Sequence, residues 1–229
     1  MKFHDRTHAG FLLAEQLMNY KNGDGVVLAV PRGGIVVAYP IAHLLHLPLD
    51  LIFCKKIGHP SHPEFAIGAV SIDGSTIATE PYSDSHRDYI EQQATTWKES
   101  MIAKRSRLMG KEQPIMLKDK TVILVDDGIA TGLTIEACLQ CIYHQGPVKV
   151  ILAVPVISRQ AYYSLATKVD TLTSLLIPDH FNAVGEFYES FKQVGDDAVR
   201  EILKDGRNID ESESTKFNLS SIRKPLPVE

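Results

Sequence analysis

Residues 121–134, Thr-Val-Ile-Leu-Val-Asp-Asp-Gly-Ile-Ala-Thr-Gly-Leu-Thr, decide the fold of this chain. A run of β-branched and apolar residues leads directly into two adjacent carboxylates, Asp126 and Asp127. A turn of small residues follows, and an apolar pattern with helical spacing begins at about Leu133. This order predicts a buried strand, a turn and a helix, with both acids at the carboxyl end of the strand. Open α/β sheets bind their ligands at that end.

The two acids and the turn form a candidate site for hydroxyls and a phosphate. Neighbouring carboxylates can accept hydrogen bonds from two vicinal hydroxyls, as in ribose, and can lie near a divalent cation. The N–H groups of Ala130–Thr134 and the positive end of the next helix suit a phosphate monoester. The segment has neither a Walker Gly-Lys-Ser/Thr nor a Gly-x-Gly-x-x-Gly fingerprint. The alternative, that Asp127 or Thr131 only caps the helix, accounts for one acid but not for both.

Predicted strands and helices alternate along the rest of the chain. Continuous apolar runs predict buried strands at 26–30, 49–54, 149–154 and 172–177. Helical spacing or composition predicts helices at about 7–20, 35–45, 83–109, 159–166 and 196–203. Two short runs, 65–70 and 76–79, flank Asp73-Gly74 and predict a hairpin. The alternation predicts an α/β fold with a doubly wound, mainly parallel sheet, to which the hairpin and the C-terminal region are added.

The composition is that of a folded, water-soluble protein. The chain has 229 residues, of which 44% are hydrophobic and 23% charged, enough for one α/β domain. A net charge of -4 argues against a general nucleic-acid binder. No apolar run approaches the roughly 20 residues that span a bilayer. Three cysteines and a polar N-terminus without a signal-type apolar core suggest a reducing, cytoplasmic location. Cys138 and Cys141 are expected to face the core rather than to bind zinc.

The acidic segment resembles the phosphoribosyl pyrophosphate signature of the type I phosphoribosyltransferases. In that signature an apolar strand leads into two acids, two small or apolar residues, an Ala/Thr pair, a glycine, a variable residue and a threonine. The resemblance implies that Asp126 and Asp127 are catalytic and bind the ribose hydroxyls, directly or through Mg²⁺-bound water. It implies Mg²⁺ as cofactor, held mainly by ligand oxygens and water, with the two acids as indirect ligands. It also implies a loop for the 5′-phosphate, made of Ile129, Ala130, Thr131, Gly132, Leu133 and Thr134.

Two basic segments follow the first two predicted strands, and the resemblance assigns both to pyrophosphate. The first is Pro31-Arg32-Gly33-Gly34, in which the glycine pair permits close approach of backbone to an anion and Arg32 suits a bidentate phosphate contact. A plain strand-to-helix turn is the alternative. The second is Lys55-Lys56. Adjacent residues of an extended chain point to opposite sides, so one lysine, Lys56, is expected to reach the ligand as a catalytic residue. The alternative is a solvated pair.

The long segment at about 57–115 is expected to be an insertion that holds a mobile lid. Family members carry a lid between these strands that closes over the ligands and excludes water. Gly58–Glu64 is the predicted mobile part. The run Lys104–Arg107 is expected to be a solvated helix face, or else to contact pyrophosphate from the lid.

The C-terminal region is expected to contain the acceptor site. In the family a variable hood, here at about 178–192, covers the sheet and holds the acceptor base. Phe181, Phe187 and Tyr188 are candidates for stacking on that base, although an aromatic cluster is more often part of the core. Residues 1–205 are predicted to form one phosphoribosyltransferase-like domain, and 206–229 a polar tail or arm.

The resulting hypothesis is an enzyme of nucleotide salvage or synthesis. It would transfer a phosphoribosyl group from phosphoribosyl pyrophosphate to a nitrogenous base, with Mg²⁺, and release pyrophosphate. One alternative is a non-catalytic sensor of phosphoribosyl pyrophosphate that acts on a protein partner. Another is an unrelated sugar-phosphate binder. The expected partners are the donor and an unknown acceptor, without nucleic acid or membrane. The family is often dimeric, so a homodimer is one possible assembly, although the sequence does not give the oligomeric state.

Overall fold

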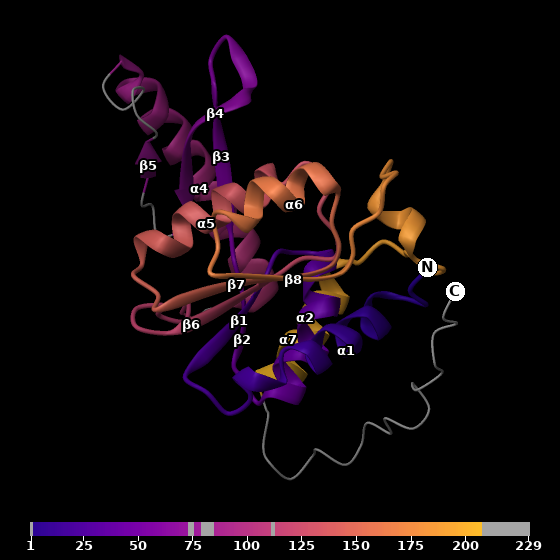
Figure 1. Ribbon diagram of the computed structural model, residues 1–229. Helices are drawn as coiled ribbons and strands as arrows, with labels where there is room; N and C mark the ends of the chain where they lie inside the picture. Colours follow the sequence, from indigo (N-terminus) through magenta and orange to yellow (C-terminus); the bar gives the residue numbers. More distant parts are fainter. Residues whose placement is uncertain (1, 73–75, 79–84, 111–112, 208–229) are drawn as a thin grey trace.

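A parallel sheet of five strands forms the centre of the fold. We describe a computed structural model, in which residues 2–72, 76–78, 85–110 and 113–207 are described. The strands of the sheet are β1 (Gly25–Ala29), β2 (Leu49–Leu51), β6 (Thr121–Val125), β7 (Lys149–Val156) and β8 (Thr171–Leu176). Their order is β2-β1-β6-β7-β8, and every neighbouring pair is parallel (Figure 1).

Helices cover both faces of this sheet (Figure 1). On one face lie α1 (Arg6–Gln16), α2 (Gly33–Leu45) and α7 (Asp196–Arg207), and on the other α5 (Leu133–His144) and α6 (Arg159–Ala166). Val27 and Ile123 pack into the core on the first face, while their neighbours Val26 and Val122 pack into the core on the second. Alternate residues of β1, β6 and β7 thus enter different cores, which explains why these three central strands are mainly apolar. The predicted α/β class and doubly wound parallel sheet are confirmed.

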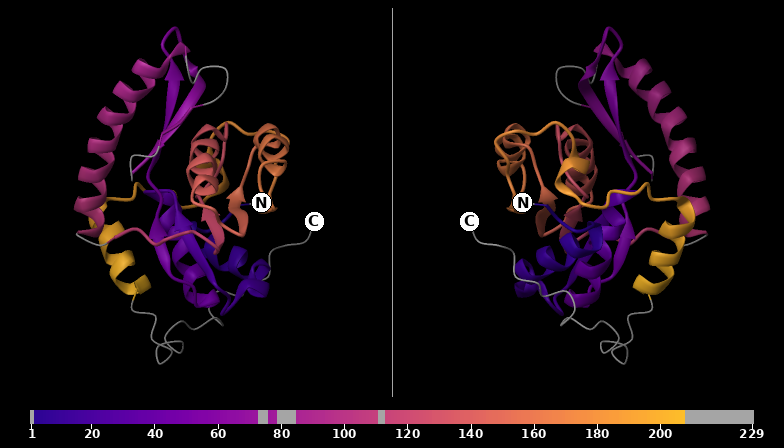
Figure 2. Two further views of the ribbon diagram at one scale, coloured as in Figure 1. Left: turned by 90° about the vertical axis from the view of Figure 1, so that its left-hand side faces the viewer. Right: turned by 90° about the vertical axis from the view of Figure 1, so that its right-hand side faces the viewer.

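A smaller antiparallel sheet and a long helix are inserted after β2. The sheet consists of β3 (Cys54–His59), β4 (His62–Ser71) and β5 (Thr76–Ala78), and the helix is α4 (Arg87–Met109). Figure 2 shows them projecting together from the body of the molecule. The predicted hairpin is present as β4 and β5, whose register pairs Gly68 with Ala78. The predicted turn Asp73-Gly74 lies outside the described residues.

One sequence prediction is wrong in this region. The predicted strand 49–54 ends at Leu51, and Cys54 already belongs to β3, so the insertion begins before residue 57. Gly58–Glu64, the predicted mobile part, forms the ends of β3 and β4, where His59 pairs with His62, and its mobility stays a prediction. The register shifts on both sides of Gly58. Such bulges tolerate glycine inside a strand, which is why the Gly- and Pro-rich composition gave a misleading signal.

A buried ion pair attaches α4 to the parallel sheet. Arg105 donates from a terminal guanidinium nitrogen to Asp50 Oδ1 of β2 at 3.2 Å, and the backbone N–H of Ile115 donates to Asp50 Oδ2 at 2.9 Å. Arg105 is only 6% exposed, so the expectation of a solvated Lys104–Arg107 face is wrong at this residue. A buried charge needs a partner of opposite sign. The pair therefore gives α4 a defined position relative to β2.

The remaining described segments are short. Two 3₁₀ turns, η1 (Met18–Tyr20) and η2 (Val184–Phe187), follow α1 and β8. The predicted helix at 7–20 is therefore divided into α1 and η1. Among the described helices, none combines the length and the apolar character needed to cross a bilayer. Of the predicted tail, residues 208–229 lie outside the described part of the chain.

The crossing of α1 and α2 depends on a glycine, and this gives a first prediction. A Cβ at Gly10 would lie 2.4 Å from the carbonyl oxygen of Val37 and 2.5 Å from Cγ of Pro40. Gly10→Ala should therefore lower the free energy of unfolding by about 1–3 kcal/mol, measured by urea denaturation. Gly195→Ala is the control, because a Cβ there meets no described atom within 4 Å. Equal stability of the two variants would contradict the predicted close contact between the helices.

Candidate functional site

The candidate site lies where the direction of winding changes, between β1 and β6. These strands are adjacent and parallel, and Ala29 pairs with Val125 at their carboxyl ends. The N–H of Val30 extends the pairing by donating to the carbonyl oxygen of Val125 at 2.9 Å. Beyond this point the chain turns into α2 on one face and α5 on the other. Loops that separate in this way leave a crevice, which is the usual ligand site of an open α/β sheet.

Asp126 lies at the base of this crevice, partly buried beside its neighbour Asp127. Its Oδ1 accepts a hydrogen bond from the N–H of Asp127 at 2.8 Å. Burial raises the pKa of Asp126 well above its usual range, and the negative charge of Asp127 raises it further. A hydroxyl donor or a cation at this carboxyl would favour its ionised form. Asp126 is therefore suited to bind a ligand that supplies such a group.

Asp127 is held by residues from both ends of the folded chain. Arg6 of α1 donates from Nε to Asp127 Oδ2 at 2.7 Å. The same guanidinium donates to the carbonyl oxygen of Lys192 at 2.9 Å and stacks 3.7 Å from the ring centre of Phe191. The hydroxyl of Tyr188 donates to the carbonyl oxygen of Asp127 at 2.6 Å. Arg6 is a site residue that the sequence did not reveal, since a single arginine at a helix start carries no pattern.

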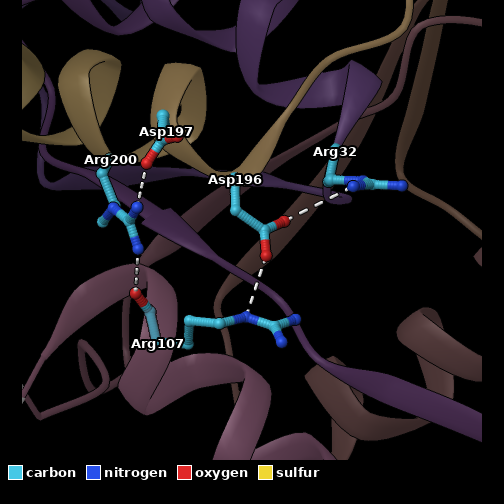
Figure 3. A network of polar contacts seen from close by, with 5 residues as sticks. All are labelled: Arg32, Arg107, Asp196, Asp197 and Arg200. Atoms are coloured by element: carbon cyan, nitrogen blue, oxygen red, sulfur yellow. Dashed lines mark hydrogen bonds and ion pairs between the residues drawn. The ribbon is translucent and has the colours of Figure 1, made fainter.

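Gly33 and Gly34 lie directly against the two acids. A Cβ at Gly33 would be 1.9 Å from Asp127 Oδ2, and one at Gly34 would be 3.0 Å from Cα of Asp126. The glycine pair was predicted to let backbone approach an anion, and the anions that it meets here are these carboxylates. Arg32 points to α7, where its guanidinium lies 3.5 Å from Asp196 Oδ1 (Figure 3). Asp196 is a second polar residue that the sequence did not single out.

The turn before α5 leads directly into the amino-terminal end of that helix. Gly132 adopts a left-handed conformation (φ 81°) and precedes α5, and no described side chain caps the helix. The first amides of a helix lack partners within it, so this end suits an anion. Thr131 and Thr134 are exposed beside it. Ile129 differs, because its side chain is buried and its N–H donates to the carbonyl oxygen of Val156 at 2.9 Å. It anchors the turn to β7.

A cavity of about 420 Å³ opens beside this turn, between β3, α4 and the start of α5. Lys55, Lys56 and Lys104 line it together with Trp97, and Nζ of Lys55 lies 4.6 Å from the centre of the Trp97 indole. No Asp or Glu is found among the described residues that line it. Lys55 and Lys56 were expected at the end of the second parallel strand. They belong to β3 instead, yet both reach the cavity with Pro31.

The predicted hood packs on the acidic turn. Gly128 is the contact point, since a Cβ there would lie 2.3 Å from Cγ1 of Val184 in η2. Tyr188 is only 4% exposed and its ring centre lies 5.4 Å from that of Phe3, so its placement favours the core interpretation. Burial raises the pKa of the Tyr188 hydroxyl, which keeps it protonated as a donor. Phe181 and Phe187 remain partly exposed, with ring centres 5.2 Å apart.

The Cys-x-x-Cys pair is part of the core, as predicted. Cys138 and Cys141 of α5 are each 1% exposed and carry free thiols. Cys54 of β3 lies next to them, and burial raises the pKa of its thiol well above the usual range. The sequence did not indicate that Cys54 joins the other two. The Cys54 thiol therefore favours its neutral form, and the three cysteines belong to a packed interface between α5 and β3.

Comparison with known proteins places this site in a family. The sequence model described as "Phosphoribosyl transferase domain" matches residues 6–192. Two Mycobacterium tuberculosis proteins, MT0597 of strain CDC 1551 and Rv0571c of strain H37Rv, are provisionally named phosphoribosyl transferases. Each is 36% identical to this chain over 200 residues, which are 86% of the chain but 45% of the relative. The chain thus spans less than half the length of these curated relatives.

One solved structure shares both sequence and fold with this chain. The crystal structure of TT1426 from Thermus thermophilus is 38% identical in sequence, with a TM-score of 0.83. The similarity covers 90% of this chain and 99% of TT1426. Arg6, the acidic turn and η2 all fall within the region matched by the family model, whereas α7 begins after it. The chain therefore belongs to the phosphoribosyl transferase family.

Proposed function

We propose that this protein transfers a phosphoribosyl group from phosphoribosyl pyrophosphate to a nitrogenous base and releases pyrophosphate. Asp126 and Asp127 bind the ribose hydroxyls in this proposal, and Ala130–Thr134 hold the 5′-phosphate. The loop Pro31–Gly34 and the β3 lysines Lys55 and Lys56 hold the pyrophosphate. The acceptor lies under the hood, where Phe181 and Phe187 have exposed ring surface. The reaction would serve nucleotide salvage or synthesis in the cytoplasm, with residues 1–205 as the catalytic domain and a homodimer as the assembly.

One observation carries the proposal: three segments, far apart in the chain, meet at the β1/β6 switch point with complementary chemistry. The turn after β6 offers carboxylates and the uncapped start of α5, the loop after β1 offers a glycine pair and Arg32, and β3 offers lysines beside the cavity. A ligand with vicinal hydroxyls, a phosphate monoester and a pyrophosphate carries the matching groups. A simple sugar phosphate would leave the lysine-lined cavity without a counter-charge.

The chain's contribution to catalysis would be positioning and charge stabilisation. The bond from the anomeric carbon to the pyrophosphate oxygen breaks, the pyrophosphate leaves with the electron pair, and the acceptor nitrogen forms the new bond. Lys55 and Lys56 would stabilise the charge that develops on the leaving group. Asp126 and Asp127 would hold the ribose so that the anomeric carbon faces the acceptor. Enclosure between α4, β3 and the hood would exclude water from the cation-like centre.

The donor set fits Mg²⁺ held through the ligand. Mg²⁺ prefers oxygen ligands and retains several waters, so one or two carboxylates and phosphate oxygens suffice. Asp126 and Asp127 supply carboxylate oxygens at the strand end, and Arg6 already occupies Oδ2 of Asp127, which favours contact through water. No cluster of three or more His, Cys, Asp or Glu side chains suited to a metal occurs in the described part of the chain. Bound Mg²⁺ would neutralise charge on the departing pyrophosphate.

The central prediction concerns the two acids. Wild-type protein should bind phosphoribosyl pyrophosphate in the presence of Mg²⁺, and Asp126→Asn combined with Asp127→Asn should abolish binding, because neutral amides cannot hold both hydroxyls and a hydrated cation. Isothermal titration measures this. Asp24→Asn is the control, since Asp24 pairs with Lys120 at the amino-terminal ends of β1 and β6, opposite to the candidate site. Undiminished binding by the double variant would remove the site assignment.

A second prediction tests the support of Asp127. The side chains of Arg6 and Asp127 are 10% and 16% exposed, so Arg6→Met leaves a largely buried carboxylate without its partner. The free energy of unfolding should fall by roughly 3–5 kcal/mol in urea denaturation. Arg159→Met, which breaks the exposed Arg159–Asp179 pair, should change it by less than about 1 kcal/mol. A similar fall in the free energy of unfolding of both variants would show that the Arg6–Asp127 pair stabilises the fold no more than an exposed ion pair does.

A third prediction separates transfer from sensing. Purine, pyrimidine and nicotinate-type bases would be supplied with phosphoribosyl pyrophosphate and Mg²⁺, and pyrophosphate release would be recorded. A transferase should release pyrophosphate with at least one acceptor class, and the double Asp→Asn variant should not. Tight donor binding without release across the whole panel would favour the sensor. Equal affinity for ribose 5-phosphate and for phosphoribosyl pyrophosphate would instead favour a sugar-phosphate binder.

A further inference from the structure

Cationic side chains from three different elements gather beside the loop that follows β1. Arg32 comes from that loop, Lys55 from β3, and Lys104 and Arg107 from α4. Burial lowers the pKa of Lys104, and the positive charges of Arg32, Arg107 and Lys55 lower it further. The geometry agrees, because Arg32 and Arg107 both contact Asp196 and because Lys55 and Lys104 line the same cavity. A cluster of positive charges is stabilised when an anion binds to it.

One carboxylate of the chain itself lies in this cluster. Asp196 places Oδ2 2.8 Å from Nε of Arg107 and Oδ1 3.5 Å from a terminal nitrogen of Arg32, so it bridges the two guanidinium groups (Figure 3). Bridging of two guanidiniums by neighbouring oxygens is also how a phosphate is held. Its neighbour Asp197 turns away and pairs with Arg200 of the same helix (Figure 3). Among the residues that the structure describes, Asp196 is thus the acid that pairs with cations of this cluster.

The position of Asp196 is set by a helix outside the family match. It is the first residue of α7, whereas the match ends at residue 192. The helix is anchored by Val199 and Leu203, which are 0% and 4% exposed and pack into the core shared with α2 and α4. The side chain of Asp196 remains 24% exposed. The carboxylate is therefore reachable from solvent.

We propose that Asp196 occupies the place of an anionic ligand, and that a pyrophosphate group displaces it to be bound by Arg32 and Arg107 together. The inference rests on the proposed function, which supplies the pyrophosphate, and it adds Arg107 and α7 to the binding site. The 3.5 Å contact to Arg32 is the weaker of the two, so displacement begins there. A pyrophosphate has oxygens enough to replace both contacts at once. Inorganic phosphate carries less charge and competes less well, so the carboxylate selects for two linked phosphates.

The test measures the affinity of the full-length protein for inorganic pyrophosphate by isothermal titration. Asp196→Asn keeps the size of the side chain and removes the competing charge, so pyrophosphate should bind about fivefold tighter or more, as expected when two surface ion pairs are lost. Asp197→Asn is the matched control, since it removes the same charge one residue further along α7 and should leave the affinity within about twofold. Arg107→Gln added to Asp196→Asn should cancel the gain. Circular dichroism and thermal unfolding verify that each variant is folded.

The outcomes are distinct. Unchanged or weaker pyrophosphate binding in folded Asp196→Asn would overturn the inference, because a carboxylate that positions the arginines would have been lost instead of a competitor. An equal gain in Asp197→Asn would also overturn it, since general charge would then explain the effect. If binding of phosphoribosyl pyrophosphate requires Asp126 and Asp127 while Asp196→Asn leaves the pyrophosphate affinity unchanged, the proposed function is kept. That result rejects only the displacement of Asp196 by pyrophosphate. Tighter pyrophosphate binding by Asp196→Asn, with no binding of phosphoribosyl pyrophosphate by the wild-type protein, supports the displacement of Asp196 and rejects the proposed function.

Discussion

The structure depends on the pairing of one largely buried carboxylate. Asp127 stands at the end of a central strand, where a charge without a partner would be costly, and Arg6 supplies the opposite charge at 2.7 Å. Because the same guanidinium also contacts Phe191 and Lys192, the first helix and the end of the hood are held on one turn. Tyr188 closes the arrangement from the hood through the carbonyl oxygen of Asp127. The geometry of the candidate site thus follows from the pairing of the Asp127 carboxylate with Arg6.

The parallel core could be predicted because its signals are local. A strand buried on both faces must be apolar at consecutive positions, and residues 121–125 and 149–154 show this directly. The region after Leu51 has no such signal. In β3 the exposed Lys55 and half-buried Lys56 follow one another, and the register shifts beside Gly58, so strand pairing there is defined by contacts with β4. A composition rich in Gly, Pro and His indicated a loop where tertiary pairing makes a strand.

The same distinction explains which site residues the sequence revealed. Asp126, Asp127 and the glycine pair stand in short segments whose order alone predicts a strand end, an acid pair and a close turn. Arg6, Arg105 and Asp196 act on partners 121, 55 and 164 residues away, and a single charged residue gives no hint of such a partner. Local sequence therefore predicts where a ligand can bind. The residues that hold the binding groups in place become visible only when the chain is folded.

The net charge of the chain does not reveal the local charge at the site. The chain carries a net charge of -4, yet the cavity beside α4 has lysines and, among its described lining residues, no acid. Lys104 and Arg107 of the insertion and Arg32 of the core loop form one positive region, and Asp196 of α7 is the acid placed within it. Two elements added to the parallel core, one before β6 and one after the family match, thus act on the same loop. Affinity for an anion at Arg32 follows from the balance between them, because each changes the charge that the loop presents to a ligand.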